Sequence, residues 1–321
     1  MRLILRILFF LLAMLALAPA CRADTDREDA AVDIGIYINH INSLSYKQGT
    51  FTVDMTLWFR WKNPSLHPDK TFAIKGATIL ARRDEYSGSM SGSDAQWAGV
   101  DVVATLDQQF DVRHFPFDEQ KLLIQIEEIE QDGNTLSYRL DTDNIRLNRS
   151  LAINGWKIRS DHASVARHAY ETSFGYTGNT GQQKFIASRM NYELNIARVS
   201  PLSGIRLIFA PIVAIFILFF TSLLPTTQSA RFSVGTTAIF ALVSSHYLIL
   251  SQLPETAYIT LAESIVIFGL LQSLVYFMVT VYSSNAHARG KLDLHQKLDR
   301  FLAMALGMSN VLFAGFIAWL I

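Results

Sequence analysis

Four long apolar segments in the C-terminal part of this 321-residue chain constrain its fold more than any other feature. They occupy residues 202–224, 232–250, 257–282 and 301–321, and each approaches the length of about 20 residues that a membrane-spanning helix requires. Half of the residues are hydrophobic and only 17% are charged, a balance that is unusual for a water-soluble chain. The sequence therefore predicts a membrane protein with four spanning helices, at about residues 202–224, 229–251, 257–282 and 299–321.

A fifth apolar run, residues 3–18, follows Arg2 and Arg6 and ends in small residues. This pattern is typical of a cleaved secretory signal, so residues 1–23 are predicted to be a signal peptide. Cys21, the only cysteine, would leave with it, and no disulfide is expected. Export would place residues 24–200 outside the membrane. The distribution of basic residues agrees with this orientation, because they gather in the connections expected inside: Arg231, Arg289, Lys291, Lys297 and Arg300.

The exported part has a different pattern, with short runs in which apolar and polar residues alternate. The clearest run is 51–61, where Val53, Met55, Leu57 and Phe59 are expected to point into a core. Several such runs separated by Gly, Asn, Asp and Pro predict a β-sandwich over residues 24–200, followed directly by the helical domain at 201–321.

The second apolar segment carries an unusual number of hydroxyl groups. If it is a helix, six residues recur at steps of four and three and lie on one face: Ser233, Thr237, Phe240, Ser244, Tyr247 and Ser251. Single hydroxyls bond back to their own helix, but a whole stripe indicates contact with water or with another polar helix surface.

Enzyme motifs are absent from the sequence. The run Gly88 to Gly92 is spaced like a nucleophile elbow but has Met90 where that motif needs serine. No glycine-rich phosphate loop occurs, and no His or Cys pair has the spacing of metal ligands. We therefore expect no enzymatic activity, no cofactor and no nucleic-acid partner.

The segment Asp111 to Gln120, which contains Phe115-Pro116-Phe117-Asp118, resembles the signature loop of the pentameric ligand-gated ion channels, the Cys-loop receptor superfamily. Gln108 and Leu122 stand where cysteines bracket this loop in animal receptors, as in bacterial relatives. The order of signal, sandwich, signature loop, Arg198 and four spans also resembles this family over essentially the whole mature chain. The resemblance implies an extracellular β-sandwich followed by a four-helix transmembrane domain, a β+α membrane protein in a bacterial inner membrane with the sandwich on the periplasmic side.

In this family five copies of the second helix line a central pore, so the resemblance implies a homopentamer in the lipid bilayer that conducts monovalent ions. The implied pore-lining residues are Ser229, Ser233, Thr237, Phe240, Ser244, Tyr247 and Ser251. Phe240 matches the position of the family's hydrophobic gate, and Tyr247 would form a second narrow ring. The alternative is that Phe240 packs against a neighbouring helix.

The family binds its agonists between adjacent sandwiches, and this sequence departs from the family there. The loop that normally supplies an aromatic residue is acidic: Glu127, Glu128, Glu130 and Asp132. These carboxylates suit a small amine or a divalent metal, and the alternative is a solvated turn. A later loop offers Tyr170, Phe174 and Tyr176 as an aromatic wall, and Trp58 and Arg60 would face the cleft from the next subunit. Protons are the rival agonist, with His246 and the acidic clusters as groups that could titrate.

Coupling between the two domains is expected at the base of the sandwich. The residues that the resemblance implies are Tyr46, Lys47, Phe115, Pro116, Phe117, Asp118, Arg198, Leu253, Pro254 and Glu255. Asp118 and Arg198 would form the family's buried pair.

Charge selectivity is open at this point. Gln228, Ser229 and Ala230 precede Arg231, which is closer to the anion-selective pattern, whereas residues 24–200 contain 24 acidic and 19 basic side chains. An acidic vestibule concentrates cations, and cation selectivity is slightly favoured. The alternatives are an anion-selective or proton-gated channel of the same family, or a non-conducting membrane-anchored receptor for a small molecule.

Overall fold

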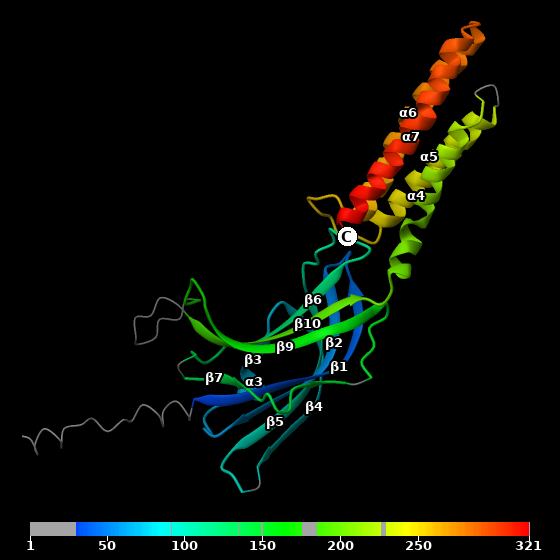
Figure 1. The fold of residues 1–321 in the computed structure, drawn as a ribbon. Coiled ribbons are helices and arrows are strands. Elements are labelled where there is room, and N and C mark those ends of the chain that lie inside the picture. Colours follow the sequence, from blue (N-terminus) through cyan, green and yellow to red (C-terminus); the bar gives the residue numbers. More distant parts are fainter. Residues whose placement is uncertain are drawn as a thin grey trace, which may run out of the picture.

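The structure is a computed structural model, and it describes residues 30–90, 92–133, 135–148, 150–174, 185–225 and 229–320. The predicted signal peptide, Tyr176 and Gln228 lie outside the described residues. A strand domain and a bundle of long helices lie end to end, so the molecule is elongated (Figure 1). The end of α7 returns to the junction of the two domains, whereas the α6–α7 connection lies at the far end of the bundle (Figure 1).

The strand domain is a sandwich of two sheets. One sheet has six strands in the order β4-β5-β2-β1-β7, with β8 also paired to β1, and the other has four in the order β3-β6-β10-β9. The strands are β1 (Ala31–Ser45), β2 (Thr50–Trp61), β3 (Phe72–Ile74), β4 (Ala77–Ser89), β5 (Gln96–Asp107), β6 (Glu119–Glu128), β7 (Ser137–Leu140), β8 (Arg146–Leu147), β9 (Trp156–Ala169) and β10 (Ile186–Arg198), with one helical turn, α3 (Pro68–Thr71), before β3.

The core of the sandwich follows the predicted alternation. In β2 every second residue is buried, and Val53, Met55, Leu57 and Phe59 are completely inaccessible. Thr56, Trp58 and Arg60 lie on the opposite face and are half-buried. The indole ring of Trp58 covers β1 at Gly35, where an added Cβ would come within 2.1 Å of the ring, so this position accepts only glycine.

Four helices are long and apolar enough to cross a membrane: α4 (Pro201–Ser222), α5 (Ala230–Leu250), α6 (Leu261–Ala288) and α7 (Leu292–Leu320). Three ends differ from the prediction by four residues or more, one of them the end of α6, which lies at Ala288 rather than near 282. Helix α6 begins four residues later than expected, because Thr260 and Glu263 form a reciprocal capping box that fixes its first turn. Helix α7 begins at Leu292 rather than near 299. Its first turns are helical but polar, and the prediction from hydropathy therefore left them out.

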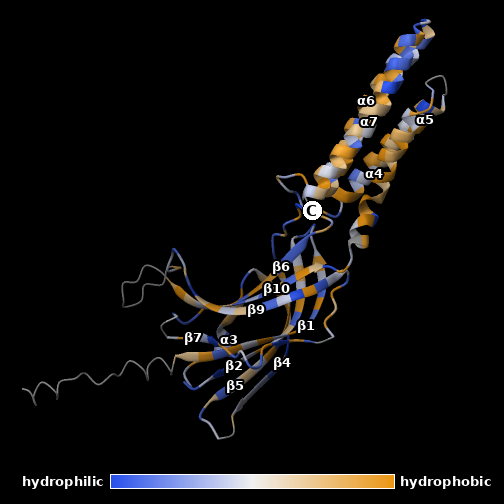
Figure 2. Cartoon of the chain, in the orientation of Figure 1, coloured by the Kyte–Doolittle hydropathy of each residue, from blue (hydrophilic) through white to orange (hydrophobic). Residues whose placement is uncertain are grey.

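Hydropathy changes along the length of the helices. The middle of each helix is hydrophobic, and the ends of α6 and α7 that lie farthest from the sandwich are hydrophilic (Figure 2). Helix α7 is the least covered, with 11% of its span buried, against 39% for α4 and α6. It is held to α6 by stacked rings of Phe268 and Phe313, 3.9 Å apart, and by Gln272, whose amide donates to Ser309 and Asn310.

Candidate functional site

Helix α5 has a buried face and an exposed face. The buried residues are Arg231, Gly235, Ala238, Leu242, Ser245 and Ile249. The predicted stripe lies outside this face: Ser229, Ser233, Thr237, Phe240, Ser244 and Tyr247 are exposed in the single subunit, and Ser251 is half-buried. The hydroxyls of Ser233, Thr237 and Ser251 donate to main-chain oxygens of their own helix, which leaves their lone pairs free to accept from water.

The two large residues of the stripe are exposed in the single subunit. Phe240 is 68% and Tyr247 is 78% accessible, although both lie in a helix that packs against α4 and α6. The interpretation in which Phe240 packs against a neighbouring helix therefore does not hold within the subunit. Burial of these rings requires another molecule or another copy of the chain.

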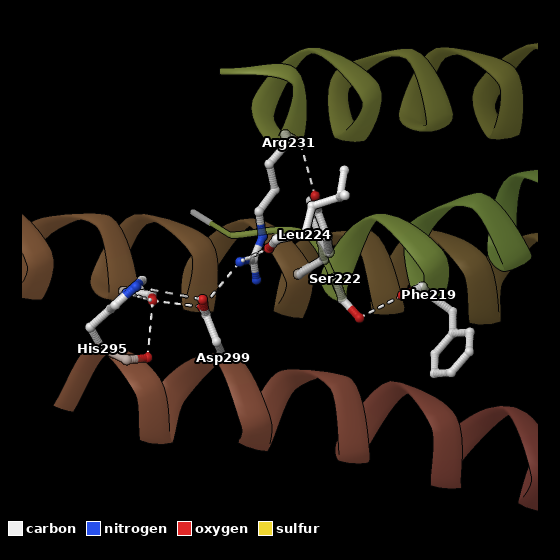
Figure 3. Close-up of polar contacts among 8 residues, drawn as sticks. Phe219, Ser222, Leu224, Arg231, His295 and Asp299 are labelled. Carbon is white, nitrogen blue, oxygen red and sulfur yellow. Dashed lines mark hydrogen bonds and ion pairs between the residues drawn. The ribbon is translucent and has the colours of Figure 1, made fainter. Parts of the chain in front are cut away.

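Arg231, near the start of the same helix, has the opposite environment. Its side chain is completely buried and points away from the stripe, toward α4 and α7 (Figure 3). Its Nη1 donates to the carbonyl of Leu224 at 2.8 Å and to Asp299 Oδ1 at 3.0 Å. The arginine that the sequence suggested as an anion-selective feature is thus an internal ion pair.

At the base of the sandwich, Asp118 is buried and has three partners. Arg198 Nε lies 3.5 Å from its Oδ1, Gln120 donates to its Oδ2 at 2.7 Å, and the hydroxyl of Tyr46 donates to the same oxygen. Burial and the nearby Asp118 carboxylate raise the pKa of the Tyr46 phenol well above its usual value, so it remains a donor. The Arg198 guanidinium also lies over the rings of Tyr46, Phe115 and Trp156.

The loop that contains Asp118 contacts the helical domain through its main chain. The amides of Leu261 and Ala262, at the start of α6, donate to the carbonyls of Arg113 and Phe115. The Tyr258 hydroxyl accepts from the amide of Val112 at 3.2 Å. These contacts were not predicted, because main-chain bonds leave no signal in residue type.

The other coupling residues divide into two groups. Pro116 and Phe117 lie against Gly204 of α4, where an added Cβ would be 2.9 Å from the Pro116 oxygen, and Leu253 is buried. Lys47 and Glu255 are exposed in the single subunit, and Pro254 is half-buried. The structure therefore brings the loop 112–118 and the starts of α4 and α6 together, and it leaves Lys47 without a packing role in the subunit.

The acidic loop differs from both interpretations of the sequence, because its first two carboxylates are buried and bonded within the subunit. Glu127 is 1% exposed and accepts from Arg189 Nε and from the Tyr170 hydroxyl, each at 2.6 Å. Lys75 Nζ lies 3.9 Å away. Glu127 thus lies at the centre of an internal network, and a ligand amine would have to displace Arg189 to reach it, so its ligand-binding role stays a prediction.

Glu128 has no cationic partner within the described residues. It is completely buried and accepts from Thr71 Oγ1 at 2.7 Å and from the amides of Glu130 and Gln131. Burial raises the pKa of this carboxyl above its usual value, and the hydrogen bonds oppose the rise only in part. Protonation would remove the charge that holds the start of the loop after β6.

The divalent metal interpretation is not supported by this geometry. Within the described residues no three His, Cys, Asp or Glu side chains are grouped as metal ligands, and Glu127 and Glu128 are committed to protein partners. Glu130 is exposed and Asp132 is half-buried. The aromatic wall is partly present, since the ring of Tyr170 lies 5.0 Å from that of Phe174, which is 67% exposed.

Trp58 and Arg60 line a groove of about 480 Å³ on the outer face of the six-stranded sheet, together with Thr56, Tyr86, Met90, Trp97, Gly99, Asp141 and Asn144. The Trp58 indole donates to Asp141 at 3.0 Å. Arg60 is paired to Asp33 at 2.7 Å, and Arg139 binds the same carboxylate. The guanidinium of Arg60 is therefore partly neutralised, but Trp58 presents its ring to the groove.

No protein-family model matches the chain. The chain is similar to a proton-gated ion channel of Gloeobacter violaceus, with 24% identity over 280 residues that cover 81% of this chain and 74% of the relative. Because neither the strand domain nor the helical domain alone makes up that share, the match includes parts of both. This similarity bears out the recognition of an ion-channel family, and the observed sandwich followed by four helices bears out the predicted fold class.

Proposed function

We propose that five copies of this chain, a member of the pentameric ligand-gated ion channel family, form a gated ion channel in a membrane. Helix α5 of each copy lines the central pore with its exposed stripe, and the sandwiches form the part that receives the activating signal. Cyclic symmetry brings five identical stripes together, so no second gene product is needed.

One observation carries this proposal. The exposed face of α5 combines hydroxyls with two large exposed rings, in a helix whose opposite face is buried against its own subunit. Lipid tails offer these hydroxyls no partner, so this face, which also carries Phe240 and Tyr247, lies against water or another polar helix surface. A narrow water-filled pore accounts for both, because hydroxyls line it and five rings close it by dewetting.

The membrane orientation follows the charges. The sandwich and the end of α7 lie on the same side (Figure 1). The opposite end of the bundle is formed by the α6–α7 connection, with Arg289 and Lys291, and by the first turns of α7, with Lys297 and Arg300. The positive-inside rule supports our proposal that that end faces the cytoplasm. The sandwich would then lie on the periplasmic side, and the bacterial source of the relative supports a bacterial inner membrane.

The direct test is current through a planar bilayer that contains the purified protein. The outer solution is acidified in steps from about pH 7.5 to about pH 4.5, and small amines are applied separately at neutral pH. Protein-free bilayers and a heat-denatured sample are the controls. The absence of current under every condition, from protein shown by cross-linking to be oligomeric, would favour the non-conducting receptor.

Protons are the activator that we favour over an amine. The relative is a proton-gated ion channel, and this chain has a buried carboxyl, Glu128, whose pKa is raised by burial. The amine site is weaker, because Glu127 is already paired with Arg189. Activation by an amine at neutral pH, with no response to acid, would reverse this order.

Cation selectivity is our proposal for the pore. The exported part carries more acidic than basic residues, and an acidic vestibule raises the local cation concentration. The positive charge of Arg231 is paired inside the subunit, so it does not oppose this field at the inner mouth.

A further inference from the structure

The inner end of α5 has one basic residue, and the structure keeps its charge out of the stripe. Arg231 is completely buried, whereas Ser229, Ala230 and Ser233 around it are exposed. An arginine side chain is always charged in proteins, so its burial requires a counter-charge. The side chain that supplies this charge comes from α7 (Figure 3), the least covered of the four helices.

Asp299 is the counter-charge, and it is held in place from two sides. Its Oδ1 lies 3.0 Å from Arg231 Nη1 and accepts from Ser283 Oγ of α6 at 2.7 Å. His295, one turn earlier on α7, lies 3.9 Å from its Oδ2. Residues 201–320 contain only one other acidic side chain near this end, Asp293, which is exposed and has no ion pair in the described part of the chain.

The guanidinium of Arg231 has few hydrogen-bond partners besides Asp299. The guanidinium Nε and Nη2 are buried and have no hydrogen-bond partner within the described residues, so Asp299 and the Leu224 carbonyl are the only hydrogen-bond partners of the guanidinium there. A guanidinium that loses its counter-charge must move to water, and a long arginine side chain can do so by extending to the nearest wet surface. At the start of the pore helix that surface is the inner mouth.

On the premise of the proposed pore, we infer that Asp299 is a determinant of ion selectivity. By holding Arg231 inside each subunit, it keeps five positive charges away from the inner mouth of the channel. The residue does not line the pore and acts only through Arg231. This role extends the selectivity control from the pore-lining helix to the helix farthest from the axis.

The test is the reversal potential in a sodium chloride gradient across a bilayer, for the unchanged channel and for Asp299→Asn. We expect the variant to shift toward the chloride equilibrium potential, with the chloride-to-sodium permeability ratio raised by about two-fold or more, because five charges then lie near the permeant ions. Asp299→Glu, which keeps the charge, should change the ratio little. The double variant Arg231→Gln with Asp299→Asn should return the ratio to that of the unchanged channel.

Arg231→Gln alone gives an independent check, because its charge is already hidden from the pore. Its permeability ratio should equal that of the unchanged channel, and a shift toward cations would show that Arg231 already acts on the pore, which overturns the inference. The inference would also be overturned if Asp299→Asn had the same permeability ratio as the unchanged channel. If Asp299→Asn does not assemble, the permeability ratio of Arg231→Gln tests the inference instead. A silent unchanged channel would instead contradict the proposed function.

Discussion

Arg198 Nε lies 3.5 Å from Asp118 Oδ1, and this contact joins the last residue of β10 to the loop that touches α4 and α6. Arg198 is followed within three residues by the start of α4. The ion pair therefore lies where the covalent connection and the loop contact between the two domains meet. A movement of the sandwich relative to the helices would therefore act on the surroundings of Asp118 as well as on the main-chain contacts of its loop.

The hydroxyl of Tyr46 is predicted to stabilise this junction. Tyr46→Phe removes a donor from a buried carboxylate, and hydrogen bonds to charged groups contribute about 1.5 to 3 kcal/mol. We expect the variant to lower the free energy of unfolding of the sandwich by that amount, measured by denaturation in detergent. Tyr37→Phe on β1 is the matched control, since the Tyr37 hydroxyl makes no hydrogen bond within the described residues. Equal effects of the two variants would contradict the role of Tyr46.

The exposed face of α5 is predicted to be wet. Cysteines placed at Ser233, Thr237 and Ser244 should react with a charged, water-soluble thiol reagent in the assembled channel, whereas cysteines at Ala238 and Leu242 should not, because those positions are buried. The chain has only one native cysteine, Cys21, so little background is expected. Equal reaction rates for the two sets, measured by mass shift, would rule out a pore along this face.

Phe240 is predicted to close the resting channel. Phe240→Ser replaces five rings by hydroxyls, so the barrier to hydrated ions is lost, and current without activator should rise by about ten-fold or more. Tyr247→Ser should have a smaller effect, because the phenol already tolerates water. Channels with Phe240→Ser that reach the membrane and remain silent until activated would place the barrier elsewhere on the stripe.

Glu127 and Arg189 are predicted to act as one unit. Either Glu127→Gln or Arg189→Gln leaves a buried charge without its partner and should lower the free energy of unfolding by about 3 to 5 kcal/mol. The double variant should lose much less than the sum of the two, which a double-mutant cycle measures directly. Additive losses would mean that the two residues stabilise the sandwich independently.

Glu128 is predicted to make the sandwich more stable in acid than at neutral pH over part of the range. Its pKa is raised on folding, so the folded state binds the proton more tightly than the unfolded chain does. Stability therefore falls as pH rises from the usual value of 4.5 through the raised pKa of the folded state. Glu128→Gln should flatten this part of the curve, measured as the unfolding midpoint at several pH values.

The same variant connects stability to activation. If protonation of Glu128 contributes to opening, Glu128→Gln mimics the protonated form and should shift activation toward neutral pH, with the maximal current preserved. Glu130→Gln is the matched control, since Glu130 is exposed on the same loop. An unchanged pH dependence of current would separate Glu128 from gating, even if its effect on stability is present.

Periodic features could be read from the sequence because they depend on neighbours. The alternation in residues 51–61 placed Val53 and Phe59 in the core, and the steps of three and four placed Phe240 and Tyr247 on one face of α5. Both patterns repeat within a few residues, so a single chain segment determines them. The helix ends were less accessible, because the first turns of α7 are polar and hydropathy alone omits them.

The environment of the carboxylates could not be read in this way. Glu127 is neutralised by Arg189, 62 residues away, and Asp299 by Arg231, 68 residues away. An isolated acidic run looks the same whether it is solvated, binds a ligand or is paired internally. Only the pairing of β6 with β10, and the reach of the Arg231 side chain from α5 to α7, decide the outcome.

Helix α7 is exposed along most of its length, yet its end farthest from the sandwich carries Asp299, the partner of Arg231 on α5. An exposed apolar helix in a bilayer takes its tilt and depth from the hydrocarbon thickness around it. A thinner or thicker bilayer would therefore move Asp299 relative to Arg231 without touching the pore. The thickness of the bilayer would then affect the function of the channel. Reconstitution in lipids with acyl chains of different length should change the conductance of the channel as well as its stability.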